Sequence, residues 1–242
     1  MEKEEVHFYS AGHRLTGYWY PPKTSTEKAP AVVCCHGFSA MIDVQLVGVP
    51  EALSDAGYGA LTFYCRGLGK SEGPRGRVIP WEQVEDVRNA ISYLQTRADV
   101  DPTRIGIWGL SYGGLLTSQA LARNSDLFIA GADLAGVHLY GSSLDSTNLS
   151  YQSSAISAID TWKSPVFLIQ GDDDRNVAFS QMVGLVQLLR SHNIYYELTV
   201  IPDDLHESML HSRWLDTWNR MGDFLKRFVW GHGTAAVGGK SQ

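Results

Sequence analysis

Apolar segments alternate with amphipathic segments along most of this chain, and this alternation restricts the folds open to it. Six runs are predicted to be buried strands: AVVCCHG, GALTFYC, RIGIWGL, LFIAGADLAG, SPVFLIQG and YYELTVIP. The segments between them favour helices; residues 80–97, for example, begin with a proline and repeat apolar side chains at spacings of three and four. Near-continuous hydrophobic strands separated by helices are typical of a mostly parallel sheet covered on both faces. We therefore predict an α/β fold.

The chain is predicted to form one domain. It has 242 residues, of which 44% are hydrophobic and 19% are charged, and this composition fits a compact body with a large core. Two strand-like pieces, residues 6–10 and 15–20, favour a hairpin ahead of the alternating part, which makes a sheet of about eight strands. No repeat or linker divides the sequence. We expect the domain to cover residues 1–230 and the tail, residues 231–242, to be disordered.

Composition and charge exclude several classes of protein. The net charge is −6 and no basic stripe is present, so no nucleic-acid partner is expected. No window approaches the roughly 18 apolar residues of a membrane span, and the acidic N-terminus lacks the apolar stretch of a signal peptide. Cys34, Cys35 and Cys65, without a CxxC or HExxH pattern, are typical of buried free thiols in a reducing cytoplasm. We expect a cytoplasmic protein with no metal and no cofactor; its oligomeric state stays open, with a homodimer as one alternative.

Two segments match the pattern G-x-S-x-G, which marks a nucleophilic serine when it forms a sharp turn between a strand and a helix. The first segment, GKSEG, contains Ser71 and is followed by Pro74 and further glycines, so we expect a loop there. The second, GLSYG, contains Ser111; the strand RIGIWGL runs into it and the apolar helix GGLLTSQALA follows it. Ser111 is the predicted nucleophile, and Ser71 is predicted to be a turn residue.

A serine nucleophile needs a general base, and the base needs an acid that orients it. Four histidines follow Ser111. His192 ends a helix, His211 lies within the predicted last helix and His232 lies in the tail. His206 alone sits in a loop just past a strand, so it is the predicted base.

Position in the sequence does not select the acid. Five aspartates follow the last two strands, either directly after VFLIQG or just before His206: Asp172, Asp173, Asp174, Asp203 and Asp204. Three adjacent carboxylates cannot all face inward, and most of them are expected to be solvated or to bind backbone amides at the turn.

Acyl transfer also needs two N–H donors aimed at the tetrahedral intermediate. One is expected to be the amide of Tyr112, directly after the nucleophile. The other is expected in the loop after the strand AVVCC. His36 and Gly37 end that strand, which makes the amide of Phe38 the predicted second donor.

From about residue 6 to residue 229 the sequence resembles an α/β-hydrolase. The segments HGFSA, CRGLGKSEGP, GLSYGG, GDDDRNV and DDLHE carry this resemblance in the family's order and at family-like spacings. The second half resembles the catalytic domain of the prolyl oligopeptidase family, where the acid is the Asp of a G-x-x-D-x-x-V pattern; this resemblance implies Asp174 as the acid. The first half resembles the lysophospholipase and feruloyl-esterase branch, although Tyr64 stands where that branch usually has Asp.

The resemblance implies a single-domain α/β-hydrolase fold without a large cap. Many esterases of this fold carry a cap between the sixth and seventh strands, whereas residues 137–164 here are few, polar and serine-rich, enough for a small flap. An open site of this kind suits small or flexible esters.

Three hypotheses for function follow. The leading one is a serine carboxylesterase that cleaves small or medium acyl esters, its small-molecule substrates, through an acyl-enzyme intermediate. The alternative is a small aminopeptidase or acyl-peptide hydrolase of the prolyl oligopeptidase type. The third is a binding protein of hydrolase fold whose catalytic residues are relicts, and the complete set of serine, acid, histidine and glycines argues against it.

Overall fold

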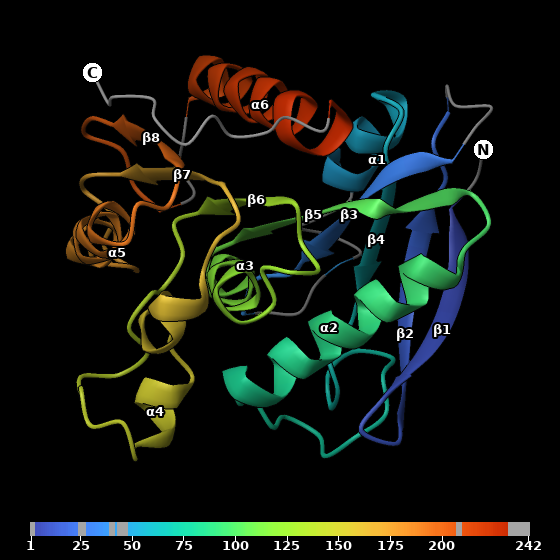
Figure 1. The fold of residues 1–242 in the computed structure, drawn as a ribbon, viewed down its shortest axis with the longest axis horizontal. Coiled ribbons are helices and arrows are strands. Elements are labelled where there is room, and N and C mark those ends of the chain that lie inside the picture. Colours follow the sequence, from blue (N-terminus) through green and yellow to red (C-terminus); the bar gives the residue numbers. More distant parts are fainter. Residues whose placement is uncertain (1–2, 24–27, 39–41, 43–47, 207–209, 232–242) are drawn as a thin grey trace.

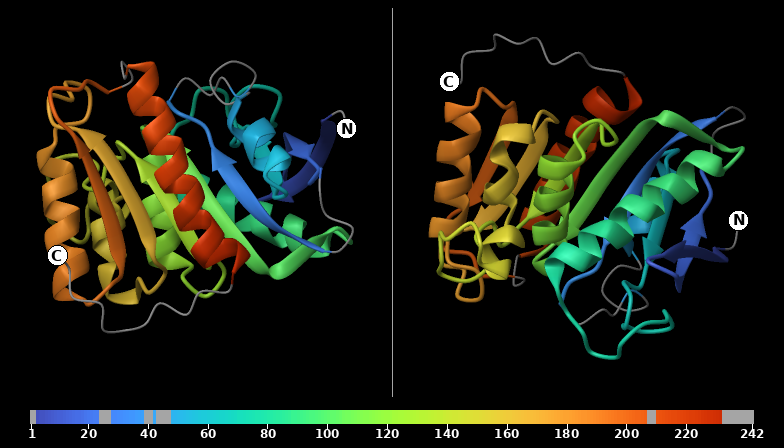
Figure 2. Two further views of the ribbon diagram at one scale, coloured as in Figure 1. Left: turned by 90° about the horizontal axis from the view of Figure 1, so that it is seen from above. Right: turned by 60° about the horizontal axis from the view of Figure 1, so that its bottom comes forward.

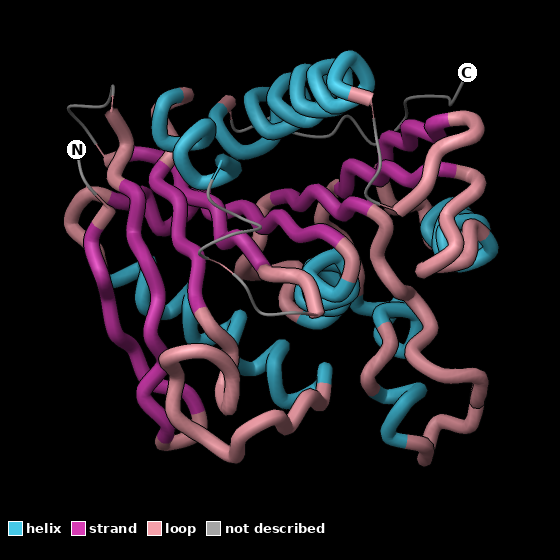
Figure 3. The backbone as a smooth tube through the Cα atoms, turned by 180° about the vertical axis from the view of Figure 1, so that it is seen from behind, coloured by secondary structure: helices cyan, strands magenta, loops and turns pink. Residues whose placement is uncertain are grey.

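One eight-stranded sheet runs through the molecule, and helices cover both of its faces. The computed structural model describes residues 3–23, 28–38, 42, 48–206 and 210–231. The strands lie in the order β1-β2-β4-β3-β5-β6-β7-β8, and Figures 1 and 3 show them as one continuous, twisted sheet. Their bounds are β1 Glu4–Ser10, β2 His13–Tyr20, β3 Ala29–Cys35, β4 Gly59–Phe63, β5 Val100–Leu110, β6 Ala130–Leu134, β7 Val166–Gly171 and β8 Tyr196–Ile201.

The sheet is parallel except at one side. β1 pairs with β2 and β2 with β4 in antiparallel fashion, and every other neighbouring pair is parallel. The predicted hairpin is β1-β2, and its turn places Ala11 and Gly12 at φ 46° and 80°. Because a parallel sheet is covered on both faces, its central strands are apolar throughout, and all residues of β3 and β4 are buried. The predicted α/β class and mostly parallel sheet are confirmed.

The helices divide into two groups (Figures 1 and 2). The helices α2, α3 and α5 pack on one face of the sheet, and α1 and α6 pack on the other. One hydrophobic core forms on each face. The apolar spacing noted in residues 80–97 is the stripe that α2 buries. The helical bounds are α1 Gly48–Asp55, α2 Pro80–Thr96, α3 Tyr112–Arg123, α4 Leu149–Gln152, the 3₁₀ helix η1 Ala155–Thr161, α5 Ser180–Ser191, α6 His211–Leu225 and the π-helical turn η2 Lys226–Trp230.

The insert between β6 and β7 is short, as predicted. It contains only α4 and η1: η1 packs against α3 and α5, and α4 lies at the lower edge of the molecule in Figure 1, so the insert forms no cap domain. The tail that we predicted to be disordered lies, apart from Gly231, outside the described residues. Within the described part of the chain, no helix is both long enough and apolar enough to cross a bilayer.

The parallel strands bring distant loops to one edge of the sheet. Because β3, β5, β6, β7 and β8 run in the same direction, their carboxyl ends, and the loops that follow them, share that edge. Ligand sites of open α/β sheets lie at this edge. Each residue predicted to act in chemistry follows one of these strands.

Candidate active site

Ser111 lies at a strained turn between β5 and α3. Its backbone adopts φ 60° and ψ −119°, a conformation that non-glycine residues rarely take and that clusters at functional sites. The Ser111 amide donates to the carbonyl of Leu134 at 2.8 Å, and the Ser111 carbonyl accepts from the amide of Leu115 at 3.1 Å. A Cβ atom at Gly109 would collide with the Gly113 carbonyl, and one at Gly113 with the Cys35 carbonyl. The turn therefore requires both glycines of the G-x-S-x-G pattern.

His206 and Asp174 form a buried pair. Nδ1 of His206 lies 2.7 Å from Oδ2 of Asp174, and their side chains are 6% and 0% exposed. The other carboxylate oxygen, Oδ1, accepts from the backbone amides of Asn176 and Val177 at 2.9 and 2.8 Å. Burial alone would raise the pKa of Asp174, but the hydrogen bonds from His206 and the two amides outweigh it and hold that pKa below its ordinary value. The carboxylate is therefore ionised and acts on His206 through Nδ1.

The other ring nitrogen of His206 is buried and free. Among the described residues, Nε2 has no hydrogen-bond partner, so the structure brings His206 to Asp174 but forms no hydrogen bond between His206 and Ser111. Hydrogen bonds of this kind are often long before substrate binds. Ser111, Asp174 and His206 follow β5, β7 and β8 at the same sheet edge.

The four rival aspartates are used elsewhere or point to solvent. Asp172 accepts from the amide of Asp203 at 2.7 Å, and Asp173 pairs with Arg175 at the surface. Asp204 pairs with Arg213 at 3.0 Å. Asp203 is itself exposed and holds a turn at φ 55°. These contacts leave Asp174 as the carboxylate bonded to His206.

The two residues that carry the predicted oxyanion donors are in contact through their rings. Tyr112 is the first residue of α3, where backbone N–H groups have no partner within the helix. The ring of Phe38, 64% exposed, packs edge-to-face on the ring of Tyr112, with centroids 5.6 Å apart. The helix N-terminus and its dipole favour negative charge at this place.

His36 fixes the peptide that carries the Phe38 amide. Nδ1 of His36 lies 2.7 Å from the Gly37 carbonyl and donates to it, while Nε2 accepts from the Cys65 amide. Burial lowers the pKa of His36, so the ring is uncharged in this role. Because the Gly37 carbonyl and the Phe38 N–H belong to one planar trans peptide, holding the first orients the second. The sequence places His36 before the loop but does not reveal this hydrogen bond.

Ser71, the serine of the first G-x-S-x-G match, is fully buried in a loop. Its hydroxyl donates to the Tyr64 carbonyl at 2.5 Å and accepts from the Thr16 amide at 2.9 Å. Both bonds tie the loop to the backbone of the sheet. Ser71 has the structural position that the sequence predicted.

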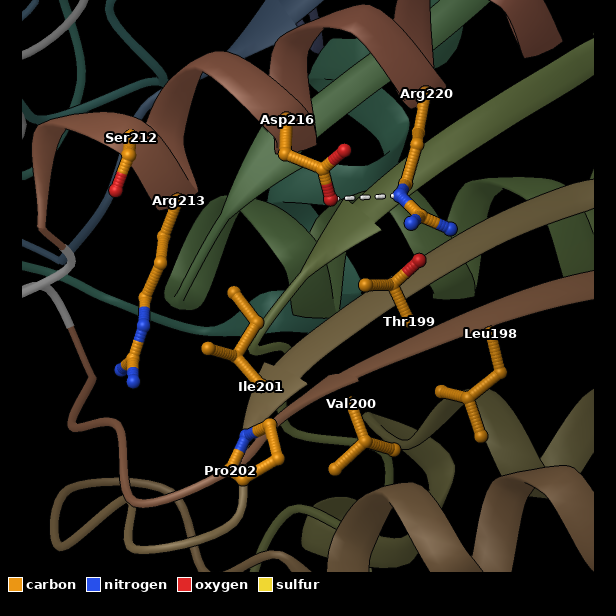
Figure 4. Close-up of a pocket in the computed structure, with 9 residues that line it drawn as sticks. All are labelled: Leu198, Thr199, Val200, Ile201, Pro202, Ser212, Arg213, Asp216 and Arg220. Atoms are coloured by element: carbon orange, nitrogen blue, oxygen red, sulfur yellow. Dashed lines mark hydrogen bonds and ion pairs between the residues drawn. The ribbon is translucent and has the colours of Figure 1, made fainter.

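Two hollows lie away from these residues. A groove of about 440 Å³ runs between β8 and α6, where Asp216 and Arg220 pair at 2.7 Å (Figure 4). An apolar groove of about 650 Å³ lies between α1 and α6. Neither is lined by Ser111, Asp174 or His206. In the described part of the chain, no group of three His, Cys, Asp or Glu side chains could hold a metal ion, and all three cysteines are free and buried.

Comparison with known families places the chain. The sequence model of the prolyl oligopeptidase family matches residues 80–231, which is more than half of the chain. The chain belongs to this family. The model of the X-Pro dipeptidyl-peptidase (S15) family also matches, over residues 12–145. Together with the fold, these matches make the chain a member of the α/β-hydrolase superfamily.

Individual relatives agree with this assignment. Thiohydrolase aneE of Aspergillus aculeatus is 36% identical over 112 residues, which cover 46% of this chain and 34% of that protein. This chain therefore spans about a third of that relative's length. The acylaminoacyl peptidase of Pyrococcus horikoshii has a similar fold, with a TM-score of 0.79 and 23% identity over 94% of this chain and 42% of that chain. Est1E of Butyrivibrio proteoclasticus, solved with ferulic acid bound, also has a similar fold, with a TM-score of 0.75 and 21% identity over 90% of this chain and 98% of that chain.

Proposed function

We propose that this chain is a serine carboxylesterase that cleaves small or medium acyl esters through an acyl-enzyme intermediate. The observation that carries the proposal is the buried Asp174–His206 hydrogen bond. It leaves Nε2 of His206 unpaired at the sheet edge where the backbone of Ser111 is held at φ 60°.

In the proposed reaction, Oγ of Ser111 attacks the ester carbonyl carbon while Nε2 of His206 accepts the hydroxyl proton. The ionised Asp174 stabilises the imidazolium through Nδ1 and keeps the ring in the required tautomer. The amides of Phe38 and Tyr112 donate to the oxyanion of the tetrahedral intermediate.

The intermediate then collapses and the ester C–O bond breaks. His206 returns its proton to the leaving alcohol, and Ser111 remains acylated. Water attacks the acyl carbon, gives a proton to His206, and the carboxylic acid leaves as the proton returns to Ser111. The cycle consumes only ester and water.

Two other leaving groups deserve a direct comparison with alcohols. The match to a relative named a thiohydrolase favours thioesters as a second class of substrate. Membership of the prolyl oligopeptidase family favours peptides or acyl-peptides. The match to the acylaminoacyl peptidase, however, covers only 42% of that enzyme's chain. The larger part of that enzyme is not matched, so this likeness adds little support for a peptide substrate. Amines are also poorer leaving groups than alcohols and need fuller protonation by His206.

The test compares the three classes in one panel. It contains p-nitrophenyl esters of increasing acyl length, thioesters of the same acyl groups, and aminoacyl and acyl-peptide anilides. We expect kcat/KM to be highest for short or medium acyl esters. A kcat/KM for an anilide above that of every ester would contradict the carboxylesterase proposal and support a peptidase.

Covalent labelling locates the nucleophile independently of substrate choice. A fluorophosphonate probe is expected to label Ser111, and the Ser111→Ala variant should take up no label. Labelling of Ser71 would overturn the assignment.

A further inference from the structure

A second Ser–Asp–His cluster lies beneath the nucleophile turn. It consists of Ser118 on α3, Asp133 on β6 and His138 in the loop after β6, and their exposed fractions are 0%, 0% and 1%. Oγ of Ser118 forms a short hydrogen bond to Oδ2 of Asp133 and lies 3.2 Å from Nδ1 of His138. Nδ1 of His138 is 3.6 Å from the same carboxyl oxygen. None of these residues belongs to the reaction proposed above.

This cluster is built into the turn that holds Ser111. Oδ1 of Asp133 occupies the space where a Cβ atom would stand at Gly114 and at Gly136. Gly114 lies in the first turn of α3, three residues after Ser111. Leu134, the neighbour of Asp133, accepts the hydrogen bond from the Ser111 amide. The Asp133 carboxyl therefore connects the first turn of α3 with the end of β6.

The contacts of Asp133 fit a carboxyl group that carries a proton. Oγ of Ser118 lies 3.0 Å from the Gly114 carbonyl, which can only accept a hydrogen bond. A hydroxyl has one proton; when Ser118 donates that proton to Gly114, the short bond between Ser118 and Asp133 takes its proton from the carboxyl. Oδ1 of Asp133 is buried and has no partner among the described residues. An ionised carboxylate with an unpaired buried oxygen is costly, whereas a neutral acid leaves only a carbonyl oxygen there.

In the part of the chain that the structure describes, no lysine or arginine pairs with Asp133. Protonated His138 would place a second N–H at Nε2, which is buried without a partner among the described residues. The facing segments of β5 (residues 108–110), β7 (residues 167–169) and α3 (residues 113–118) carry no ionisable side chain. Burial raises the pKa of Asp133 to about 8 and lowers that of His138 to about 3. Both shifts favour the neutral side chain at pH 7.

We propose that Asp133 is a positioning residue that holds the nucleophile turn as an uncharged carboxylic acid, hydrogen-bonded to Ser118 between Gly114 and Gly136. Ionisation of Asp133 would put a negative charge beside the first turn of α3. That helix end supplies the Tyr112 amide to the oxyanion, so the charge would oppose the developing oxyanion. The catalytic part of this inference rests on the proposed function; the protonation state does not.

The protonation state is measured directly on the wild-type enzyme. Aspartate is labelled with ¹³C at Cγ, and its carboxyl resonances are followed by NMR from about pH 5 to about pH 10. We expect one buried carboxyl to keep its proton at pH 7, and its resonance to be missing in Asp133→Asn. If every aspartate is ionised at pH 7, the proposal is wrong. That outcome would be seen on the wild-type enzyme alone, so it does not depend on whether the Asp133→Asn variant folds.

The catalytic consequence is read from a pH profile. In wild type, kcat/KM for an activated ester should fall by about tenfold at high pH as Asp133 ionises beside the helix end. In Asp133→Asn, which stays neutral and nearly isosteric, this alkaline fall should be absent and kcat/KM at pH 7 should stay within about threefold of wild type. Asp126→Asn, at an exposed position between α3 and β6, is the matched control and should keep the wild-type profile.

The outcomes separate this proposal from the proposed function. A folded Asp133→Asn variant that retains the alkaline fall, or one that is inactive at pH 7, contradicts the positioning role. If Ser111→Ala keeps its activity, the proposed function fails, but the NMR titration still decides whether Asp133 is neutral.

Discussion

The molecule holds two clusters of serine, histidine and aspartate, and they differ in what surrounds the carboxyl group. Asp174 receives two backbone amides and His206, and these donors keep it ionised despite its burial. Oδ1 of Asp133 has no hydrogen-bond partner among the described residues, and burial raises the pKa of this carboxyl. Burial favours the neutral form of both carboxyls, and the comparison teaches that a carboxyl stays charged only where directed N–H groups together outweigh burial.

The histidines differ in the same way. His206 follows β8 at the open edge of the sheet and keeps Nε2 free for a proton. His138 is enclosed by the insert and α5, where its backbone amide donates to the side chain of Gln181 at 3.0 Å. Burial lowers the pKa of His138 so far that it stays neutral. In the proposed reaction the first cluster exchanges protons with a substrate, whereas the second holds its neighbours in place.

The largest expected difference between the clusters is at their serines. Ser111→Ala should lower kcat by about 10⁴- to 10⁶-fold, because the nucleophile is lost. Ser118→Ala should lower kcat by no more than about tenfold, because it removes one hydrogen bond beneath the turn. Steady-state kinetics on an activated ester measure both effects. Comparable losses in the two variants would erase the distinction between the clusters.

The aspartates should differ next most. Asp174→Asn should lower kcat by about 10²- to 10⁴-fold, because Asn can hold His206 in the wrong tautomer. Asn at position 172, 173, 203 or 204 should cost much less, and circular dichroism controls for folding. If Asp174→Asn stays near wild type while Asp203→Asn or Asp204→Asn is almost inactive, the acid has been assigned wrongly.

The two carboxyls should also give opposite pH dependence to stability. Since the pKa of folded Asp174 lies below its ordinary value of 3.8, its contribution is complete above that value and is lost as pH falls through the folded pKa. Since the pKa of folded Asp133 is raised to about 8, unfolded Asp133 ionises first and the free energy of unfolding falls as pH rises from about 4 to about 8. Urea unfolding of wild type and both variants across pH measures the two trends. Asp174→Asn should lose the fall in the free energy of unfolding at low pH, and Asp133→Asn should lose the fall between about pH 4 and about pH 8. Parallel pH curves for all three proteins would count against both assignments.

Ser71, which is fully buried, should have the smallest effect on catalysis. Ser71→Ala should leave kcat within about a few-fold of wild type, because Ser71 takes no part in the proposed reaction. The substitution should lower the free energy of unfolding by about 1–3 kcal/mol, because the Thr16 amide loses its acceptor. Kinetics and urea unfolding on the same preparation measure the two quantities. A large loss of kcat in a stable variant would return Ser71 to consideration as a nucleophile.

Local sequence was sufficient to predict most of the fold and the strand–turn–helix position of Ser111. The strand before Ser111 and the helix after it are both continuous in sequence, so their junction can be recognised without tertiary contacts. The acid could not be chosen this way, because five aspartates occupy similar local positions and the choice required a family resemblance. Its hydrogen bond to His206 spans 32 positions along the chain.

The cluster at Asp133 was not predicted at all. An aspartate in the middle of the apolar run FIAGADLAG and a second glycine directly after GLSYG are the two signals in the sequence. Each is unremarkable by itself. Their connection appears only when β6 lies next to β5 and Gly114 meets the carboxyl of Asp133.

The sequence by itself determined the alternation of strands and helices, the sharp turn at Ser111 and the order of the candidate residues, because each depends on neighbours a few positions away. Tertiary structure alone decided which aspartate meets His206, how His36 orients the Phe38 peptide, and which of two buried carboxyls is charged. Ionisation depends on the dielectric surroundings and on N–H groups supplied by distant segments. Those surroundings exist only after the sheet has assembled.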